Sequence, residues 1–359
     1  MRTVNPARRA VHRYAPVMSR VPGQPAGVER SVSRARLPET AAVLEVRRAV
    51  RGWLGEYASD TVAVALSGGA DSLALTAAAV VEADAVDALV VDHQLQPGSD
   101  VVAADAAATA LALGCRSARV LAVDVVGDGG MEAAARRVRY AALDEARNGL
   151  PVLLGHTLDD QAETVLLGLA RGSGGRSIQG MAAWAEPWGR PLLGVRRAVT
   201  RQLCADAALT PHEDPHNTSS EFTRVRLRTE VLPLLEDVLG GGVAAALART
   251  AEQLRADGAV LDALAGELLH TAGDGATLSI ETLATAPAAL RRRAIRAWLL
   301  AGGAKALTGK HLHAVDELIT DWRGQGGVAV GGGSAGSRLV AAREHGRLTL
   351  RRERQARRR

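Results

Sequence analysis

A glycine-rich hexapeptide, Ser67-Gly68-Gly69-Ala70-Asp71-Ser72, separates an apolar run over residues 61–66 from a helix-like run over residues 73–81. This succession predicts a strand, a tight turn and a helix, with glycine supplying the turn. The first N–H groups of a helix have no partner within it, and the helix dipole adds positive potential there. The hexapeptide therefore predicts a phosphate-binding loop. An ordinary strand-to-helix turn is the alternative.

The segment from residue 41 to about residue 170 alternates short apolar runs with longer amphipathic ones, which predicts βαβ units and an α/β, doubly wound parallel sheet. The expected strands are 62–66, 88–92, 119–124 and 151–155, and the expected helices are 72–83, 99–113, 131–147 and 159–170. Ligands bind at the carboxyl ends of such strands. We therefore expect one crevice where the residues after each strand converge, namely Ser67-Gly68-Gly69, Asp92-His93, Asp124 and Gly155-His156.

A length of 359 residues suggests two domains. We expect a disordered basic extension over 1–40, the α/β domain over 41–240, and a smaller, mostly helical C-terminal domain over 241–359 with a short β-ribbon and a basic tail. Gly240-Gly241-Gly242 marks the boundary between the last two. The glycine-containing stretch 171–195 is predicted to be a mobile connection.

The distribution of charge and the number of cysteines indicate which binding partners and which cellular compartment to expect. Residues 1–40 carry a net charge of +6 and residues 351–359 carry +5, so residues 41–350 carry −6 within a total of +5. The basic ends either attract nucleic acid by counterion release or only aid solubility. Cys115 and Cys204 form no CxxC or metal-ligand spacing, which is typical of the reducing cytoplasm. No apolar run reaches membrane-spanning length, so we expect a cytoplasmic protein without membrane contact.

Three acids and a histidine follow the fourth expected strand. Asp160 and Glu163 are three residues apart and share a helix face, and His156 stands at the strand end. Helix capping by Thr157, with an acid near the positive end of the dipole, explains one acid but not the group. Carboxylates beside a phosphate loop favour a cationic ligand, either Mg²⁺ or an amine substrate. Asp71 lies inside the loop and is expected to hold Mg²⁺, with helix capping as the alternative.

Arginines are expected to contact phosphates at two places. Arg136 and Arg139 lie on the expected helix 131–147, where guanidinium forks suit phosphate, although Glu132 and Arg136 are also spaced as an ordinary helical ion pair. After the polar loop 210–221 come arginines that either contact RNA phosphates or form a solvated basic face. They are Arg224, Arg226 and Arg228.

Five segments together resemble the tRNA(Ile)-lysidine synthetase family of PP-loop ATP pyrophosphatases. The hexapeptide marks only the superfamily, whereas GHTLDDQAET and EDPxN are more specific, and the resemblance covers about residues 60–240. The segments are SGGADS at 67–72, VDHQL at 91–95, EAAARRVRY at 132–140, GHTLDDQAET at 155–164 and HEDPHN at 212–217.

The resemblance implies ATP-dependent ligation of free L-lysine to C2 of the wobble cytidine of a CAU-anticodon tRNA(Ile). The tRNA is first adenylated with release of pyrophosphate, and the ε-amine of lysine then displaces AMP. By the same resemblance, Asp160 and Glu163 hold lysine with His156 nearby, and Arg136 and Arg139 meet phosphates. Residues 241–359 would bind tRNA, and a homodimer is compatible with the sequence. The resemblance also implies that ATP and its Mg²⁺ are bound by Ser67, Gly68, Gly69, Ala70, Asp71 and Ser72.

Two other functions stay open at this point. Another PP-loop tRNA-modifying enzyme, such as a thiolase, would share the loop, but such enzymes commonly need paired cysteines that this chain lacks. A non-catalytic nucleotide- or RNA-binding module would have no use for the acid cluster. Gln96 stands where many members of the family carry arginine, which puts one contact near the nucleotide or tRNA in doubt.

Overall fold

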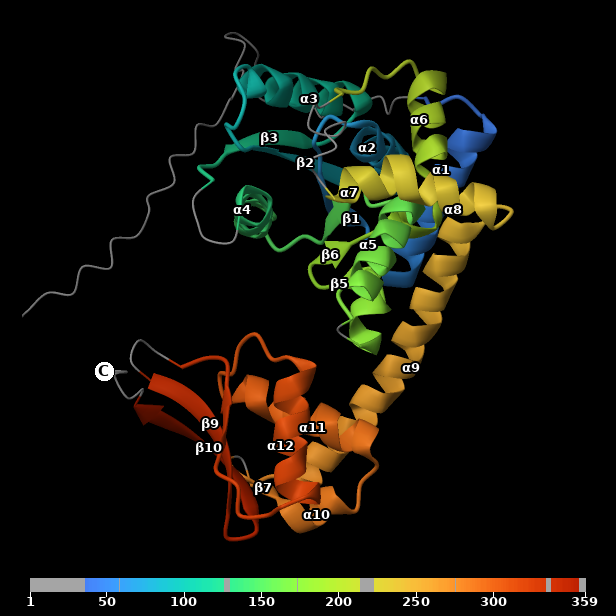
Figure 1. Cartoon of the computed structure of the whole chain (residues 1–359). Helices are drawn as coiled ribbons and strands as arrows, with labels where there is room; N and C mark the ends of the chain where they lie inside the picture. The colour runs from blue at the N-terminus through green and yellow to red at the C-terminus, as the bar shows by residue number, and fades with distance from the viewer. Residues whose placement is uncertain are drawn as a thin grey trace, which may run out of the picture. The chain divides into compact units, whose positions relative to one another are not determined.

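The computed structural model describes residues 36–57, 59–125, 130–172, 174–213, 223–274, 276–333 and 337–354, without the side chain of Glu132. The chain folds into two compact units (Figure 1). The first comprises Met1–Glu163 and Met181–Ala248, and the second comprises Thr164–Gly180 and Arg249–Arg359.

A six-stranded sheet forms the centre of the first unit, in the order β3-β2-β1-β4-β6-β5. All neighbouring strands are parallel except β5 and β6. β1 lies between β2 and β4, so the segments that follow these three strands leave the same edge of the sheet side by side. The strands are β1 (Thr61–Ala65), β2 (Ala85–Asp92), β3 (Ser117–Ala122), β4 (Val152–Leu154), β5 (Trp184–Ala185) and β6 (Trp188–Gly189).

Helices cover both faces of this sheet, which confirms the predicted α/β class (Figure 1). On one face, α1 (Ala41–Tyr57), α2 (Ala70–Glu82), α3 (Ser99–Leu113) and α6 (Arg197–Asp206) share a core with β1 and β2. On the other face, α4 (Met131–Ala146) packs Leu143 against the remaining strand side chains. Both faces of β1 are therefore buried, which explains its unbroken apolar run.

Further helical elements follow β4 and α6, and the residues from Thr164 to Gly180 among them belong to the second unit. After β4 comes α5 (Leu158–Ala170), and after α6 come α7 (Thr223–Arg226), a π-helical turn η4 (Leu227–Val231) and α8 (Leu232–Val238). The stretch 171–195, predicted as a mobile connection, contains η1 (Gly175–Ile178), β5, β6 and η2 (Pro191–Gly194). Part of this stretch packs against α1. A Cβ on Gly189 would lie 2.4 Å from the Trp53 ring, and Trp53 Nε1 donates to the Ala183 carbonyl at 3.0 Å.

The second unit combines helices with a four-stranded antiparallel sheet in the order β7-β10-β9-β8. The expected ribbon over 327–351 corresponds to three of these strands, and β7 adds a fourth. Its helices are α9 (Val243–Ala272), α10 (Ile280–Ala284), α11 (Ala288–Ala301) and α12 (Gly309–Thr320). Its strands are β7 (Leu278–Ser279), β8 (Val328–Val330), β9 (Ser337–Glu344) and β10 (Arg347–Arg354).

Among the described residues, no single helix has both the length and the apolarity to cross a membrane. One bent pair, Thr223–Val238 with Val243–Ala272, reaches that threshold only when the two helices are taken together, by length and composition alone.

Candidate active site

The predicted phosphate loop connects β1 to α2. Gly68 has φ +81°, a conformation that favours glycine, and Gly69 is the N-cap of α2 without a side-chain capping bond. Ser72 closes the turn: its Oγ accepts from the Ser67 backbone N–H at 3.2 Å and donates to the Gly69 carbonyl at 2.9 Å. The loop thus holds an uncapped helix N-terminus at the edge of the sheet, which suits an anion.

Gly69 provides a test of this loop. A Cβ at this position would meet no atom closer than Ser67 Oγ at 3.6 Å, and φ is −72°, so a side chain strains nothing in the protein itself. We expect Gly69→Val to fold normally but to weaken ATP binding by about one to two decades, because the side chain blocks phosphate from the backbone N–H groups. Calorimetric titration with ATP measures this, with Gly52→Val on α1 as the control. Unchanged affinity would remove the loop from the nucleotide site.

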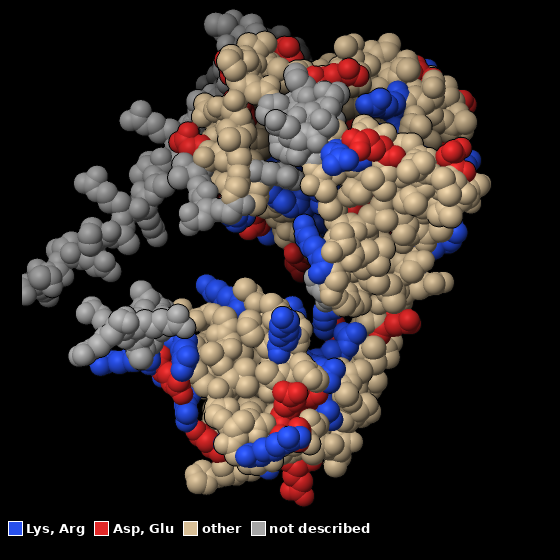
Figure 2. All heavy atoms as spheres, in the orientation of Figure 1, with Lys and Arg blue, Asp and Glu red and all other residues tan. Residues whose placement is uncertain are grey.

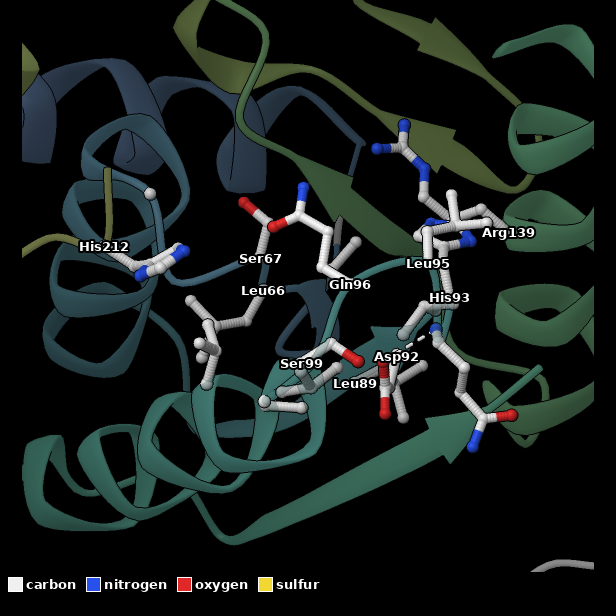
Figure 3. Close-up of a pocket in the computed structure, with 18 of the residues that line it drawn as sticks. Leu66, Ser67, Leu89, Asp92, His93, Leu95, Gln96, Ser99, Arg139 and His212 are labelled. Carbon is white, nitrogen blue, oxygen red and sulfur yellow. Dashed lines mark hydrogen bonds between the residues drawn. The ribbon is translucent and has the colours of Figure 1, made fainter. Parts of the chain in front are cut away.

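A cavity of about 590 Å³ opens beside the loop, within the size range of nucleotide pockets. It is lined by Ser67 and Gly69, by Asp92-His93 after β2, by Arg139 of α4 and by His212 (Figure 3). The backbone N–H of His212 donates to the Gly68 carbonyl at 3.0 Å, so the start of the HEDPHN segment reaches the loop. The rest of that motif, residues 214–217, lies outside the described residues.

Arg139 and His93 lie side by side at this cavity (Figure 3). Arg139 Nε and His93 Nδ1 are buried and have no hydrogen-bond partner. Burial lowers the pKa of both groups, and the charge of Arg139 adds to the effect on the pKa of His93. Arg136 stacks 4.9 Å from the Tyr140 ring centroid and donates to its hydroxyl at 3.2 Å. The alternative prediction, an ion pair between Arg136 and Glu132, stays untested because the Glu132 side chain lies outside the described residues.

The predicted acids do come together. Asp160 and Glu163 lie on α5, and Asp71 lies at the start of α2. Thr157 donates to Asp160 Oδ2 from its backbone N–H at 2.8 Å and from its hydroxyl at 2.7 Å, so this acid also stabilises the first turn of α5. Glu163 is completely buried, and Asp71 accepts a hydrogen bond from the Thr200 hydroxyl.

Arg197 of α6 is the residue that sequence reasoning missed. It contacts Asp160 Oδ1 at 2.6 Å, Asp71 Oδ2 at 3.2 Å and Glu163 Oε1 at 3.4 Å. Arg197 is separated from Asp71 by 126 positions, so the sequence does not show that the two residues meet. A short apolar run followed by two arginines, at 192–197, is its only sequence signal.

Arg228 also faces the acids, although the sequence suggested RNA phosphates for it. Its Nε lies 2.8 Å from Glu163 Oε1, and its Nη2 lies 3.4 Å from Asp160 Oδ1. Arg224 approaches Glu163 at 3.9 Å, whereas Arg226 pairs with Glu230 on the surface. We call this group the acid–arginine cluster, made of Asp71, Asp160, Glu163, Arg197, Arg224 and Arg228.

Opposing effects set the protonation of the cluster. Burial works to raise the pKa of Asp160, but the charge of Arg197 and the Thr157 hydrogen bonds hold that pKa below its ordinary value. Burial raises the pKa of Asp71 even though Thr200 and Arg197 oppose it. Burial works to lower the pKa of Arg197, yet its three carboxylate neighbours raise it. Asp160 and Arg197 are therefore firmly charged at neutral pH.

His156 follows β4 beside this cluster, with its Nδ1 buried and without a partner. Burial lowers the pKa of His156 to about 3; the charge of Asp160 opposes this shift, and those of Arg190 and Arg139 reinforce it. His156 is therefore neutral at physiological pH and offers a nitrogen for hydrogen bonding.

This shift predicts a pH-dependent stability. The unfolded chain binds a proton at His156 below about pH 6.5 and the folded chain does not, so stability is present above that pH and is lost on acidification. Between pH 7 and pH 5 we expect His156 to account for a loss of roughly 1–2 kcal/mol in the free energy of unfolding. Urea unfolding of the wild type and His156→Gln at both pH values measures it. Equal losses in the two proteins would contradict the buried, neutral imidazole.

The described residues contain no group of three or more His, Cys, Asp or Glu arranged to hold a metal ion. Asp71 has a raised pKa and both of its oxygens are engaged, but a carboxylate offers about four lone-pair positions. Mg²⁺ is usually bound by one or two carboxylates together with substrate phosphates. The donor set therefore fits an ion that arrives with a nucleotide.

Comparison with known proteins places this site in a family. A PP-loop domain model matches residues 43–235, and a TilS substrate binding domain model matches residues 278–349. The tRNA(Ile)-lysidine synthase of Nocardia farcinica is 77% identical over 311 residues, which cover 86% of this chain and 98% of that protein. The chain belongs to the tRNA(Ile)-lysidine synthase family.

Other tRNA(Ile)-lysidine synthases agree. The one from Rhodococcus erythropolis is 68% identical over 88% of this chain and 97% of its own length, and the one from Mycobacterium tuberculosis is 58% identical over 87% and 98%. The predicted family is thereby confirmed, and the protein is a tRNA-modifying enzyme with an ATP-binding PP-loop domain. The phosphate loop, the cavity and the acid–arginine cluster all lie within the PP-loop match.

Proposed function

We propose that this protein ligates L-lysine to C2 of the wobble cytidine of CAU-anticodon tRNA(Ile), through an adenylated tRNA intermediate, with release of pyrophosphate and AMP. The observation that carries the proposal is the double position of Asp71. It belongs to the phosphate loop, and it also contacts Arg197 in the acid–arginine cluster. This position supports adjacent sites for the nucleotide and the amine, as a two-step transfer requires.

The nucleotide half of the site comprises the phosphate loop and the cavity. The N–H groups of residues 67–72 hold the phosphates of ATP, and Asp71 holds Mg²⁺ when it is bound. Arg136 and Arg139 approach from α4, where the buried Nε–H of Arg139, which has no hydrogen-bond partner, suits a phosphate oxygen. These positive charges would stabilise the negative charge that develops on the phosphate oxygens during adenylation. Adenylation then makes the C2 oxygen a good leaving group.

The amine half comprises Asp160 and Glu163, which hold and orient lysine, with His156 beside them. A free lysine side chain has a pKa of about 10.4 and is an ammonium at neutral pH. It must lose a proton before it attacks C2, and a carboxylate near the reacting atoms is a suitable acceptor. His156, with its pKa lowered to about 3, is a hydrogen-bond partner rather than that acceptor.

The tRNA is proposed to contact arginines in both units. Arg224 and Arg226 have side chains that are 41% and 61% exposed, and they project from α7; Arg228 reaches RNA only if it leaves the cluster. Residues 241–359 are proposed as the second contact region. Figure 2 shows lysine and arginine side chains at several places on this part of the chain, interspersed with acidic ones, and β10 exposes Arg351, Arg352 and Arg354. A cytoplasmic location and a homodimer are proposed with this function.

One incubation tests the proposal. The protein is mixed with ATP, Mg²⁺, labelled lysine and CAU-anticodon tRNA(Ile), and the nucleosides are analysed by mass spectrometry. We expect lysidine at the wobble position and none in the same tRNA with a wobble uridine. Pyrophosphate release without lysine incorporation would indicate another PP-loop chemistry, and no pyrophosphate release would indicate a non-catalytic binding module.

A further inference from the structure

Arg190 follows β6 directly and is a buried cation. It is 8% exposed and forms no ion pair with a carboxylate among the described residues. Its Nη1 donates to the Ala182 carbonyl at 3.1 Å, whereas its buried Nε has no hydrogen-bond partner. Arg291, the other buried arginine in the described part of the chain, pairs instead with Asp316. A buried charge without a counter-charge is costly, so Arg190 suits an anion that a ligand supplies.

Two further buried nitrogens without partners, Arg139 Nε and His156 Nδ1, belong to neighbours of Arg190. Burial lowers the pKa of His156, and the charges of Arg190 and Arg139 lower it further, so both guanidinium groups lie near its ring. Asp160 opposes this shift, but its Oδ1 already contacts Arg197 at 2.6 Å. Three side chains with unused hydrogen-bonding nitrogens therefore lie together, and two of them carry positive charges that no described carboxylate pairs with.

These side chains lie beside the phosphate loop, at the same edge of the sheet. β4 pairs with β1 on one side and with β6 on the other, and neighbouring strands are about 4.8 Å apart. His156, after β4, is therefore one strand away from the loop, and Arg190, after β6, is two strands away. A Cβ on Gly155 would lie 3.0 Å from the Ser72 backbone nitrogen, so the chain before His156 touches the loop itself. A phosphate next to those at the loop would thus lie between His156 and Arg190.

We propose that Arg190, together with Arg139 and His156, binds the α-phosphate of ATP, which becomes the phosphate of AMP. This inference rests on the proposed function and adds both a residue, Arg190, and the phosphate that it contacts. The loop then holds the two phosphates that leave as pyrophosphate. Arg139 lines the nucleotide cavity and approaches from α4 (Figure 3), whereas Arg190 approaches from β6. Charged guanidinium forks are strong donors to phosphate oxygens, and a neutral imidazole can donate one further hydrogen bond.

Both half-reactions change the bonds around the α-phosphate. In the first, the C2 oxygen of cytidine bonds to the α-phosphorus, and the bond from that phosphorus to the pyrophosphate oxygen breaks. In the second, the ε-nitrogen of lysine bonds to C2, the bond from C2 to oxygen breaks, and AMP leaves with that oxygen. The amine proton passes to a carboxylate. Preorganised cations beside the α-phosphate stabilise the charge that develops on its oxygens in both steps.

Three ligands isolate the α-phosphate in a binding test. AMP carries it, adenosine lacks it, and pyrophosphate stands for the phosphates assigned to the loop. Each is titrated calorimetrically, with Mg²⁺, into the full-length protein. We expect Arg190→Gln to weaken AMP binding by about ten- to a hundredfold and to leave adenosine and pyrophosphate binding unchanged. Arg190→Lys should restore part of the loss, because it keeps the charge but not the fork. Arg116→Gln, which removes a surface pair with Asp87, is the control.

Unchanged AMP affinity in Arg190→Gln would overturn the assignment. An equal loss for AMP and adenosine would also overturn it, because Arg190 would then only support the fold. A CAU anticodon stem–loop and L-lysine are titrated in the same way, and a loss confined to either one would assign Arg190 to an RNA phosphate or a carboxylate instead. If Arg190→Gln does not fold, the milder Arg190→Lys decides: AMP binding should weaken by about tenfold and adenosine binding should not.

Transfer rates give a second test. At saturating ATP, Arg190→Gln should slow both the formation of adenylated tRNA and its chase with lysine by about a hundredfold, the usual effect of removing one donor to a developing oxyanion. Partial rescue by Arg190→Lys is expected in both steps. Rates equal to those of the wild type would overturn the assignment. A wild-type protein that binds AMP but forms no adenylated tRNA would instead refute the proposed function.

Discussion

Replacing Asp160 by Asn or Glu163 by Gln is expected to raise the lysine concentration for half-maximal ligation by about one to two decades, because each change removes a charge-assisted hydrogen bond of about 1.5–3 kcal/mol. Adenylation of tRNA by ATP should change far less, because the phosphate loop is untouched. The two half-reactions of one active site would thereby be separated.

The measurement is a pulse and chase. The adenylated tRNA is first accumulated from ATP without lysine, and lysine is then added at graded concentrations. Asp144→Asn, which removes an exposed pair with Arg147, is the control. Thermal unfolding of each variant checks that Glu163→Gln, at a completely buried position, still folds. Variants that bind lysine normally yet form no intermediate would reassign these acids to Mg²⁺–ATP.

Replacing Arg197 by Met is expected to cost about 3–5 kcal/mol in the free energy of unfolding at pH 8, the usual penalty for removing one partner of a buried ion pair. Asp71, Asp160 and Glu163 would then share too little positive charge, and the pKa values of Asp71 and Asp160, which Arg197 lowers, would rise in the folded variant. A raised folded pKa means that stability is lost as pH rises and regained as pH falls.

The deficit of Arg197→Met relative to the wild type should therefore be smaller at pH 5 than at pH 8. Urea unfolding at both pH values measures it, and Arg51→Met at a surface pair provides the control. An equal deficit at the two pH values would mean that Arg197 stabilises the unit by packing rather than by charge.

Local sequence patterns determined the main strands and helices of the first unit. The apolar run before Ser67 could only be a buried strand followed by a glycine turn, and the observed β1 and α2 begin within two residues of the prediction. The alternation along 41–170 predicted parallel strands, and their order places the phosphate loop and His156 at one edge. These features follow from hydrogen bonding and hydrophobic periodicity over a few residues, which a sequence displays directly.

Other features depended on contacts between distant parts of the chain. β5 and β6 are two residues each, too short to show a period, and exist because Trp53 and Leu153 pack against Gly189. The proximity of Asp160 to Glu163 could be inferred from their spacing on one helix. Their neutralisation by Arg197 and Arg228, 34 and 65 residues from Glu163, could not. Burial removes the water that would solvate a charge, so the partner is whichever cation the fold brings within reach, and tertiary structure alone decides which one that is.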